Sequence, residues 1–183
     1  MKHAFLAAAL LVAAPVAFAD TTSVLLDLEK MRSMSAEEYA AAVRSAPDVN
    51  VRDKDERAYL HIAAELGTPD NIAALVSAGA DVEARDKNGY TPLHVAAFGG
   101  TPDNIAALVS AGADVEARNK NGYTALHYAA LGGTPDNIAN LLEAGASGSA
   151  KTENGKTAFD LAEYNDKVKG SAVYWELDAV QYK

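Results

Sequence analysis

The sequence predicts an all-α solenoid of paired antiparallel helices with projecting hairpin loops, and three observations lead to this fold class. First, residues 68–100 and 101–133 are identical at 29 of 33 aligned positions, a fixed period that is typical of stacked structural repeats. Second, each copy contains an Asn-Gly pair, a strong signal for a tight turn. Third, the apolar residues follow helical spacing over segments too short to be stable alone.

The first helix of each copy is expected directly after the tight turn. In one copy, Thr91 is placed to cap the helix N-terminus, and Pro92 suits the first helical position because no N–H is needed there. Leu93, Ala96 and Ala97 then follow at helical spacing and form a narrow apolar stripe. The small alanines should let neighbouring copies approach closely.

The second helix of each copy is expected after a Gly-Gly pair. Thr101 precedes a proline in the same cap pattern, and Ile105, Leu108 and Val109 supply an apolar face. Gly112 follows the last turn and is expected to adopt the left-handed conformation that ends many helices. Each copy therefore contributes a hairpin loop and two short helices.

Residues 91–96 read Thr-Pro-Leu-His-Val-Ala, and residues 112–115 read Gly-Ala-Asp-Val. These segments resemble the T-P-L-H-x-A signature and the closing G-A-D-V of the ankyrin-repeat family. The resemblance covers roughly residues 48–166 and implies an ankyrin solenoid. The earliest copy departs from the pattern, with Glu56 and Ala58 where later copies have Gly and Thr, so whether it forms a complete hairpin stays open.

The ends of the array should be capped, because an exposed repeat face would be an apolar patch. Ser35 and Glu38 fit a capping box ahead of the array. We expect Trp175, with Tyr182 nearby, to close the other end through a large aromatic contact. The apolar residues expected in the capping helices are Val24, Leu28 and Met31 before the array and Val173, Leu177 and Val180 after it. The expected organisation is a signal peptide (1–19), N-terminal capping helices (20–47), three repeats (48–80, 81–113 and 114–147) and a degenerate repeat with a C-terminal capping helix (148–183).

The first nineteen residues have the pattern of a secretory signal. Lys2 and His3 give a positive start, residues 4–14 are apolar, and residues 17–19 read Ala-Phe-Ala, which suits cleavage before Asp20. The alternative is a buried N-terminal helix. We expect an exported protein, periplasmic or secreted, and the compact Ala-rich segment is typical of bacterial signals.

Composition excludes several classes of function. Acidic residues number 25 against 16 basic ones, a net charge of −9, so neither nucleic acid nor an anionic membrane surface is an expected partner. The absence of cysteine excludes disulfides, cysteine-bound metals and thiol nucleophiles. No segment beyond the N-terminal stretch is apolar enough for membrane insertion.

The candidate chemical motifs have plainer explanations. His61, His94 and His127 are spaced by 33 residues, and repeats stacked about 8–10 Å apart cannot bring them to one zinc, whose ligands lie about 2 Å from the metal. The family resemblance implies instead that each histidine ties a hairpin to a first helix. Residues 86–89 are similar to a calcium loop with its glycine misplaced, and residues 145–149 lack the final glycine of a nucleophile elbow. We therefore expect no catalytic residue, no metal, no cofactor and no enzyme activity.

The remaining candidate is a surface on which repetition turns single side chains into rows. The family resemblance implies that partners bind the concave side formed by hairpin tips and first helices, and tyrosine beside arginine is typical of interface hot spots. The alternative is that Arg85 and Arg118 only pair with Glu83 and Glu116, and that the tyrosines only cover the hairpins. The expected partner-binding residues are Arg52, Lys54, Arg57, Arg85, Lys87, Asn88, Tyr90, Phe98, Arg118, Lys120, Asn121, Tyr123, Leu131, Lys156 and Tyr164.

Differences between the two near-identical copies favour binding. Three of the four, at positions 86/119, 95/128 and 98/131, lie in the hairpin or first helix, whereas the second helices are identical. We expect a monomeric protein–protein interaction module. It would act as a periplasmic immunity, chaperone or inhibitor protein, or as a secreted effector on eukaryotic host cells, for example on phagocytosis or immune signalling, from a symbiont, pathogen or phage. A structural spacer is a further alternative.

Overall fold

The computed structural model describes residues 33–182. The expected signal peptide, and with it Val24, Leu28 and Met31, lie outside the described residues. Across the described range the secondary structure is helical apart from one isolated antiparallel bridge between Arg52 and Ala58. The predicted all-α solenoid is therefore confirmed.

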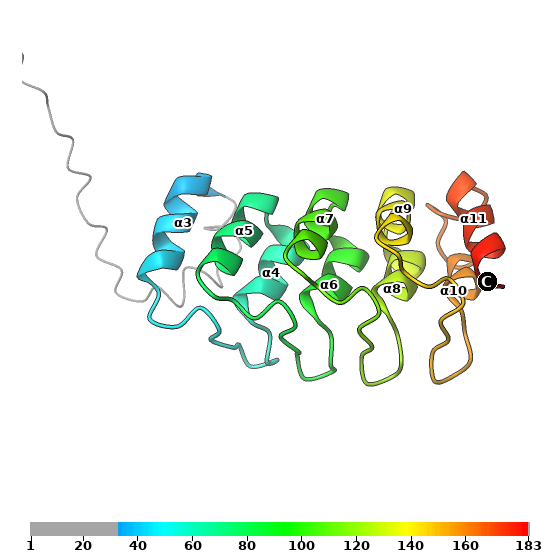
Figure 1. The fold of residues 1–183 in the computed structure, drawn as a ribbon, viewed down its shortest axis with the longest axis horizontal. Helices are drawn as coiled ribbons and strands as arrows, with labels where there is room; N and C mark the ends of the chain where they lie inside the picture. Colours follow the sequence, from blue (N-terminus) through cyan, green and yellow to red (C-terminus); the bar gives the residue numbers. More distant parts are fainter. Residues whose placement is uncertain (1–32, 183) are drawn as a thin grey trace, which may run out of the picture.

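The helices form two rows above a row of projecting loops (Figure 1). The lower row, nearest the loops, holds the first helix of each repeat: α4 (Tyr59–Leu66), α6 (Pro92–Gly99), α8 (Ala125–Gly132) and α10 (Ala158–Ala162). The upper row holds α3 (Ala36–Ser45), α5 (Pro69–Ser77), α7 (Pro102–Ser110), α9 (Pro135–Glu143) and α11 (Ala172–Val180). Between residues 33 and 182, no helix combines the length and the apolar character that a membrane crossing requires.

The second helices begin and end where the sequence predicts. The hydroxyl of Thr101 accepts the backbone N–H of Asn104 at 3.2 Å, and the same cap occurs at the starts of α5 and α9. Gly112 follows α7 with a φ of 93°, which is the left-handed region that glycine adopts without steric cost. Ile105 and Leu108 are fully buried, whereas Val109 is only partly buried.

The first helices begin after Thr91 and its counterparts, but they are capped differently from the prediction. The side chain of His94, three residues into α6, reaches back, and its Nδ1 accepts the backbone N–H of Thr91 at 3.1 Å. The Thr91 hydroxyl lies 2.8 Å from the same nitrogen. Thr124 and His127 repeat this arrangement. Leu93, the leading core residue of α6, is buried as predicted.

Buried asparagines join α7, α9 and the segment after α10 to the repeat before each of them. The amide of Asn104 donates to the carbonyl oxygens of Ala64 and Gly67, both at 3.1 Å, at the end of the preceding first helix. Asn137 and Asn165 make the equivalent pair of bonds one and two repeats further on. Because helix ends leave carbonyls without intrahelical partners, these amides satisfy groups that stacking would otherwise bury unpaired.

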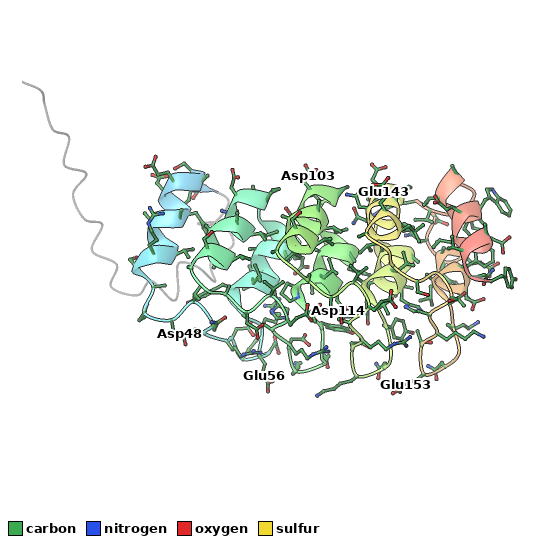
Figure 2. All side chains as sticks on the ribbon, viewed as in Figure 1. Asp48, Glu56, Asp103, Asp114, Glu143 and Glu153 are labelled. Carbon is green, nitrogen blue, oxygen red and sulfur yellow. The ribbon has the colours of Figure 1, made fainter. Side chains whose placement is uncertain are left out.

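The earliest copy does form a hairpin. The backbone N–H of Asp53 donates to the carbonyl of Arg57 at 3.0 Å, and the Asp53 carboxylate accepts the N–H groups of Asp55 and Arg57. Glu56 closes the turn with a φ of 61°, at the position that glycine occupies in later copies. Its loop projects beside the others (Figure 2). The earliest copy therefore has a complete hairpin, in which a residue with a strained backbone conformation takes the place of glycine.

The two ends differ in how well the sequence predicted them. Ser35 and Glu38 form the expected capping box at α3. At the other end the expected role of Trp175 is wrong: its side chain is 62 % exposed. Tyr174 is the buried aromatic residue of α11, and its ring lies 4.8 Å from that of Phe159. Tyr182 is 83 % exposed and does not close the stack.

Candidate protein-binding surface

The loops and first helices together form one face of the molecule, which we call the hairpin face: residues 52–66, 85–99, 118–132 and 151–164. Its loops are hydrogen-bonded to one another in series. The backbone N–H of Lys87 donates to the carbonyl of Asp55 at 3.2 Å, and that of Lys120 donates to the carbonyl of Asn88 at 3.2 Å. The rows of side chains on this face are therefore held in a fixed register.

Three of the four arginines in the predicted rows, Arg52, Arg85 and Arg118, hold adjacent loops together. Arg85 donates through Nη1 to the carbonyl of Gly89 in its own loop and to that of Arg118 in the next, at 3.2 and 2.7 Å. Arg52 and Arg118 bridge adjacent loops in the same way. A guanidinium has several donors in a rigid fork, so one side chain can bridge two carbonyls.

The alternative pairing of these arginines with glutamates is wrong. The Glu83 carboxylate instead accepts the backbone N–H of Asp114 at 2.9 Å, and that of Glu116 accepts the N–H of Ser147 at 2.7 Å. Acidic side chains on this edge therefore also join one repeat to the next. The arginine contacts and the glutamate contacts each recur after 33 residues. This explains why the arginine and the glutamate are both unchanged between the two most similar copies.

The other charged and amide side chains of the predicted rows differ in whether they have a partner within the described part of the chain. Lys87 forms an ion pair with Asp55 at 2.6 Å, and Arg57 forms one with Asp53 at 2.9 Å. Lys120 donates to the carbonyl of Lys87 at 2.6 Å. Among the lysines, arginines and asparagines of the predicted rows, those whose side chains have no hydrogen bond or ion pair with the described part of the chain are Lys54, Asn88, Asn121 and Lys156, and all four are exposed.

A chain of polar contacts crosses from one repeat to the next beside the loops. The amide nitrogen of Asn119 donates to the Tyr128 hydroxyl at 3.1 Å, and Tyr128 donates in turn to the Tyr90 hydroxyl at 2.9 Å. The orientation of the amide follows from its other contacts, because Asn119 Oδ1 accepts two backbone N–H groups. Burial raises the pKa of the Tyr128 hydroxyl, so it remains a proton donor at neutral pH.

This contact chain borders an open aromatic pocket of about 230 Å³ on the hairpin face. The ring of Tyr128 stands edge-on to Tyr90 at 5.2 Å and to Phe98 at 6.3 Å. Phe98 is half exposed at the rim. The pocket is lined by Glu65, Tyr90, His94, Val95, Phe98 and Tyr128.

The histidines tie each first helix to the next loop. His94 Nε2 lies 2.9 Å from the carbonyl oxygen of Tyr123. Because a carbonyl only accepts and Nδ1 already accepts an N–H, the proton of the neutral ring resides on Nε2. Burial lowers the pKa of His94 to about 4, and burial also lowers the pKa values of His61 and His127. All three rings are therefore neutral at pH 7.

The structure places two of the predicted residues, Tyr90 and Phe98, in the pocket. Tyr123 lies beside it, with its ring 5.4 Å from that of Tyr128. Leu131 and Tyr164 occupy the counterpart positions of Phe98 in later repeats, and both are exposed, Tyr164 at 73 %. The predicted rows thus combine arginines that are bound to neighbouring loops with exposed apolar side chains. They also contain four exposed polar side chains without a partner in the described part of the chain, Lys54, Asn88, Asn121 and Lys156, which we call the free polar tips.

Four of the six lining residues, Glu65, His94, Val95 and Tyr128, are not among the predicted partner-binding residues, although the sequence carries a signal for two of them. Glu65 lies 33 residues before Phe98 and so belongs to the same row. Tyr128 replaces Val95 between the near-identical copies. The Asn119 that replaces Asp86 supplies the donor that Tyr128 accepts. Two of the differences between copies are therefore joined by one hydrogen bond.

Comparison with known families gives two matches. A model described as ankyrin repeats (3 copies) matches residues 35–119, and one described as ankyrin repeats (many copies) matches residues 108–162. Together they extend from the start of α3 to the end of α10. A search of curated proteins finds no match.

Proposed function

Because the chain belongs to the ankyrin-repeat family, a general protein–protein interaction module, we propose that it binds a protein partner through the hairpin face. The observation that carries this proposal is the aromatic pocket, which opens on that face beside the half-exposed ring of Phe98. Clustered aromatic side chains with an accessible cavity are typical of the energetic centre of a protein interface.

Rigidity of the hairpin face also supports binding. The loops are joined to their neighbours through backbone bonds, arginine bridges and histidine contacts. A surface that is ordered before association loses little conformational entropy when a partner binds. The free polar tips, Lys54, Asn88, Asn121 and Lys156, would surround the apolar centre as a polar rim.

Variants of exposed side chains test this proposal better than charge reversal of the arginines, which would break contacts between loops. We expect Phe98→Ala and Tyr164→Ala to abolish capture of the physiological partner while leaving the melting temperature within about 2 °C of the wild type, because substitutions at exposed positions change stability little. Trp175→Ala, an exposed aromatic change on α11 and outside the hairpin face, is the matched control and should retain the partner. Equal capture by all variants would contradict the proposal.

Export is the second part of the proposal and rests on the signal pattern of residues 1–19. Fractionation of the cells that produce the protein tests export, since mature protein beginning at Asp20 should be found outside their cytoplasm. Protein confined to the periplasm would favour an immunity, chaperone or inhibitor role. Protein released into the medium or into host cells would favour an effector role, and full-length protein in the cytoplasm would contradict export.

A further inference from the structure

We propose that the aromatic pocket receives an arginine side chain of the protein partner, with the guanidinium held between the tyrosine and phenylalanine rings and the carboxylate of Glu65. This inference rests on the proposed function and deepens it, because it names the chemistry of the contact. It follows from the shape of the pocket, from its charge and from its occurrence at one position in the array.

The walls of the pocket suit a flat cation. Tyr90, Phe98 and Tyr128 contribute three rings from two adjacent repeats, with Tyr128 tilted 83° from Tyr90 and 74° from Phe98. A cation near a ring face is attracted by the electron-rich π system. Arginine is the natural occupant, because its planar guanidinium stacks on aromatic rings and is more weakly hydrated than an ammonium group.

The charge of the pocket is negative. Glu65 is the one acidic residue that lines it, and the Glu65 side chain lies beside Gly99 of α6. Among residues 33–182, the Glu65 carboxylate has no hydrogen-bond or ion-pair partner. His94 adds no positive charge, because Nδ1 accepts an N–H and Nε2 donates to a carbonyl. Arg85, the cation that acts most strongly on His94, is bound to two loop carbonyls. A carboxylate beside aromatic rings is complementary to an incoming guanidinium.

The same combination does not recur at the neighbouring positions of the array. One repeat later, Phe98 stands where Glu65 stands here, so the carboxylate is missing. One repeat earlier, Arg57 stands in place of Tyr90, Glu65 in place of Phe98 and Val95 in place of Tyr128, so none of the three rings is present. The pocket therefore marks one point of the hairpin face as the place where a single basic side chain would anchor a partner.

A titration with isolated side-chain analogues tests the inference without knowledge of the partner. The probes are Nα-acetyl-arginine methylamide and Nα-acetyl-citrulline methylamide, which have the same length but differ in charge. NMR spectra of the full chain should show the arginine probe shifting the amide signals of Tyr90, Phe98 and Tyr128. We expect the citrulline probe to bind at least tenfold more weakly.

Two variants localise the contact. Glu65→Gln should lower the affinity for the arginine probe about tenfold, and Tyr128→Val, which restores the residue found at Val95, should abolish the shifts at Phe98. Leu131→Ala is the control, because Leu131 is the counterpart of Phe98 one repeat further on and lies outside the pocket. Its affinity for the probe should equal that of the wild type.

Several results would overturn the inference: equal binding of both probes, shifts centred away from the pocket, or full affinity in Glu65→Gln and Tyr128→Val. The proposed function is tested separately, through partner capture by the Phe98 and Tyr164 variants. If capture depends on those residues while the arginine probe fails to bind, the hairpin face remains the interface and only the identity of its anchor is wrong.

Discussion

The ring of Phe98 occupies the space that a side chain on Gly132 would need. A Cβ built on Gly132 would lie 2.3 Å from Cε2 of that ring. Gly132 is the last residue of α8, so the position of Phe98 at the pocket rim depends on the absence of a side chain one repeat away. The counterpart Gly99 is different, because a Cβ there would meet only the Glu65 side chain, with Cγ at 3.4 Å and Oε1 at 3.7 Å, which are ordinary contact distances.

We therefore predict that Gly132→Ala displaces the Phe98 ring, whereas Gly99→Ala leaves the pocket intact. Because Phe98 is half exposed, its ring can swing outward, and stability should fall by less than about 1 kcal/mol. A crystal structure of each variant measures the ring position directly. An unmoved Phe98 ring in Gly132→Ala would contradict this account of the rim.

The first loop contains a strained backbone conformation that a substitution should relieve. Glu56 adopts a φ of 61° where later copies have glycine, and a left-handed conformation costs a side-chain-bearing residue about 1–2 kcal/mol. Glu56→Gly should therefore raise the free energy of unfolding by about 1 kcal/mol. Gly155→Ala is the reciprocal control, because its φ of 74° is also left-handed and no atom lies near its missing Cβ; it should lower stability by a similar amount. Urea unfolding measures both, and a loss of stability in Glu56→Gly would count against the strain.

The asparagine contacts should dominate the coupling between repeats. Asn137 is fully buried and donates to the carbonyls of Ala97 and Gly100. Asn137→Ala leaves both acceptors without that donor, and we expect a loss of at least about 2 kcal/mol, since a buried unsatisfied group costs about 1–3 kcal/mol. Asn140→Ala on the same helix removes one half-buried bond, to Pro102, and should lose about half as much. Equal stability of the two variants in urea would show that the buried pair has no special role.

Stability should fall as the pH drops from 6.5 to about 4. The pKa of His94 is lowered by burial to about 4 in the folded chain, while an unfolded histidine titrates near 6.5. Within this window the unfolded chain binds a proton that the folded chain does not, so acidification favours unfolding. The difference corresponds to roughly 3 kcal/mol for this residue, and His61 and His127 act in the same direction.

Comparison with His94→Gln isolates this contribution, because the variant and the wild type have the same carboxylates. The variant should be less stable than the wild type at pH 7, since it disturbs the contacts to Thr91 and Tyr123. Between pH 6.5 and 4, however, its free energy of unfolding should fall by less than that of the wild type. Chemical unfolding at a series of pH values gives both curves. Parallel curves would mean that His94 titrates normally in the folded state.

The helices, the caps of the second helices and the left-handed glycine at 112 could be predicted because each depends on residues within one copy. The arginine bridges could not, because their partners are backbone carbonyls, which leave no mark in the sequence. The role assigned to Trp175 failed for a local reason. It lies two residues after Val173 and therefore points away from the buried helix face, whereas Tyr174 lies beside that face and is buried.

The candidate site was predictable in part. Tyr90 and Phe98 came from the rows, and the change from Val95 to Tyr128 drew attention to the first helix. What the sequence could not show is that residues 38 positions apart, Tyr90 and Tyr128, share a hydrogen bond across a repeat boundary. Their pairing depends on the angle at which one repeat stacks on the next.

Site-specific photo-crosslinking tests the central claim, that the hairpin face binds a protein, most directly. A photoreactive phenylalanine analogue placed at Phe98 in living cells should give a discrete covalent adduct with one partner protein. The same analogue at Ser110, an exposed position on α7 in the opposite row of helices, should give none. Adducts at Ser110 but not at Phe98 would contradict the account.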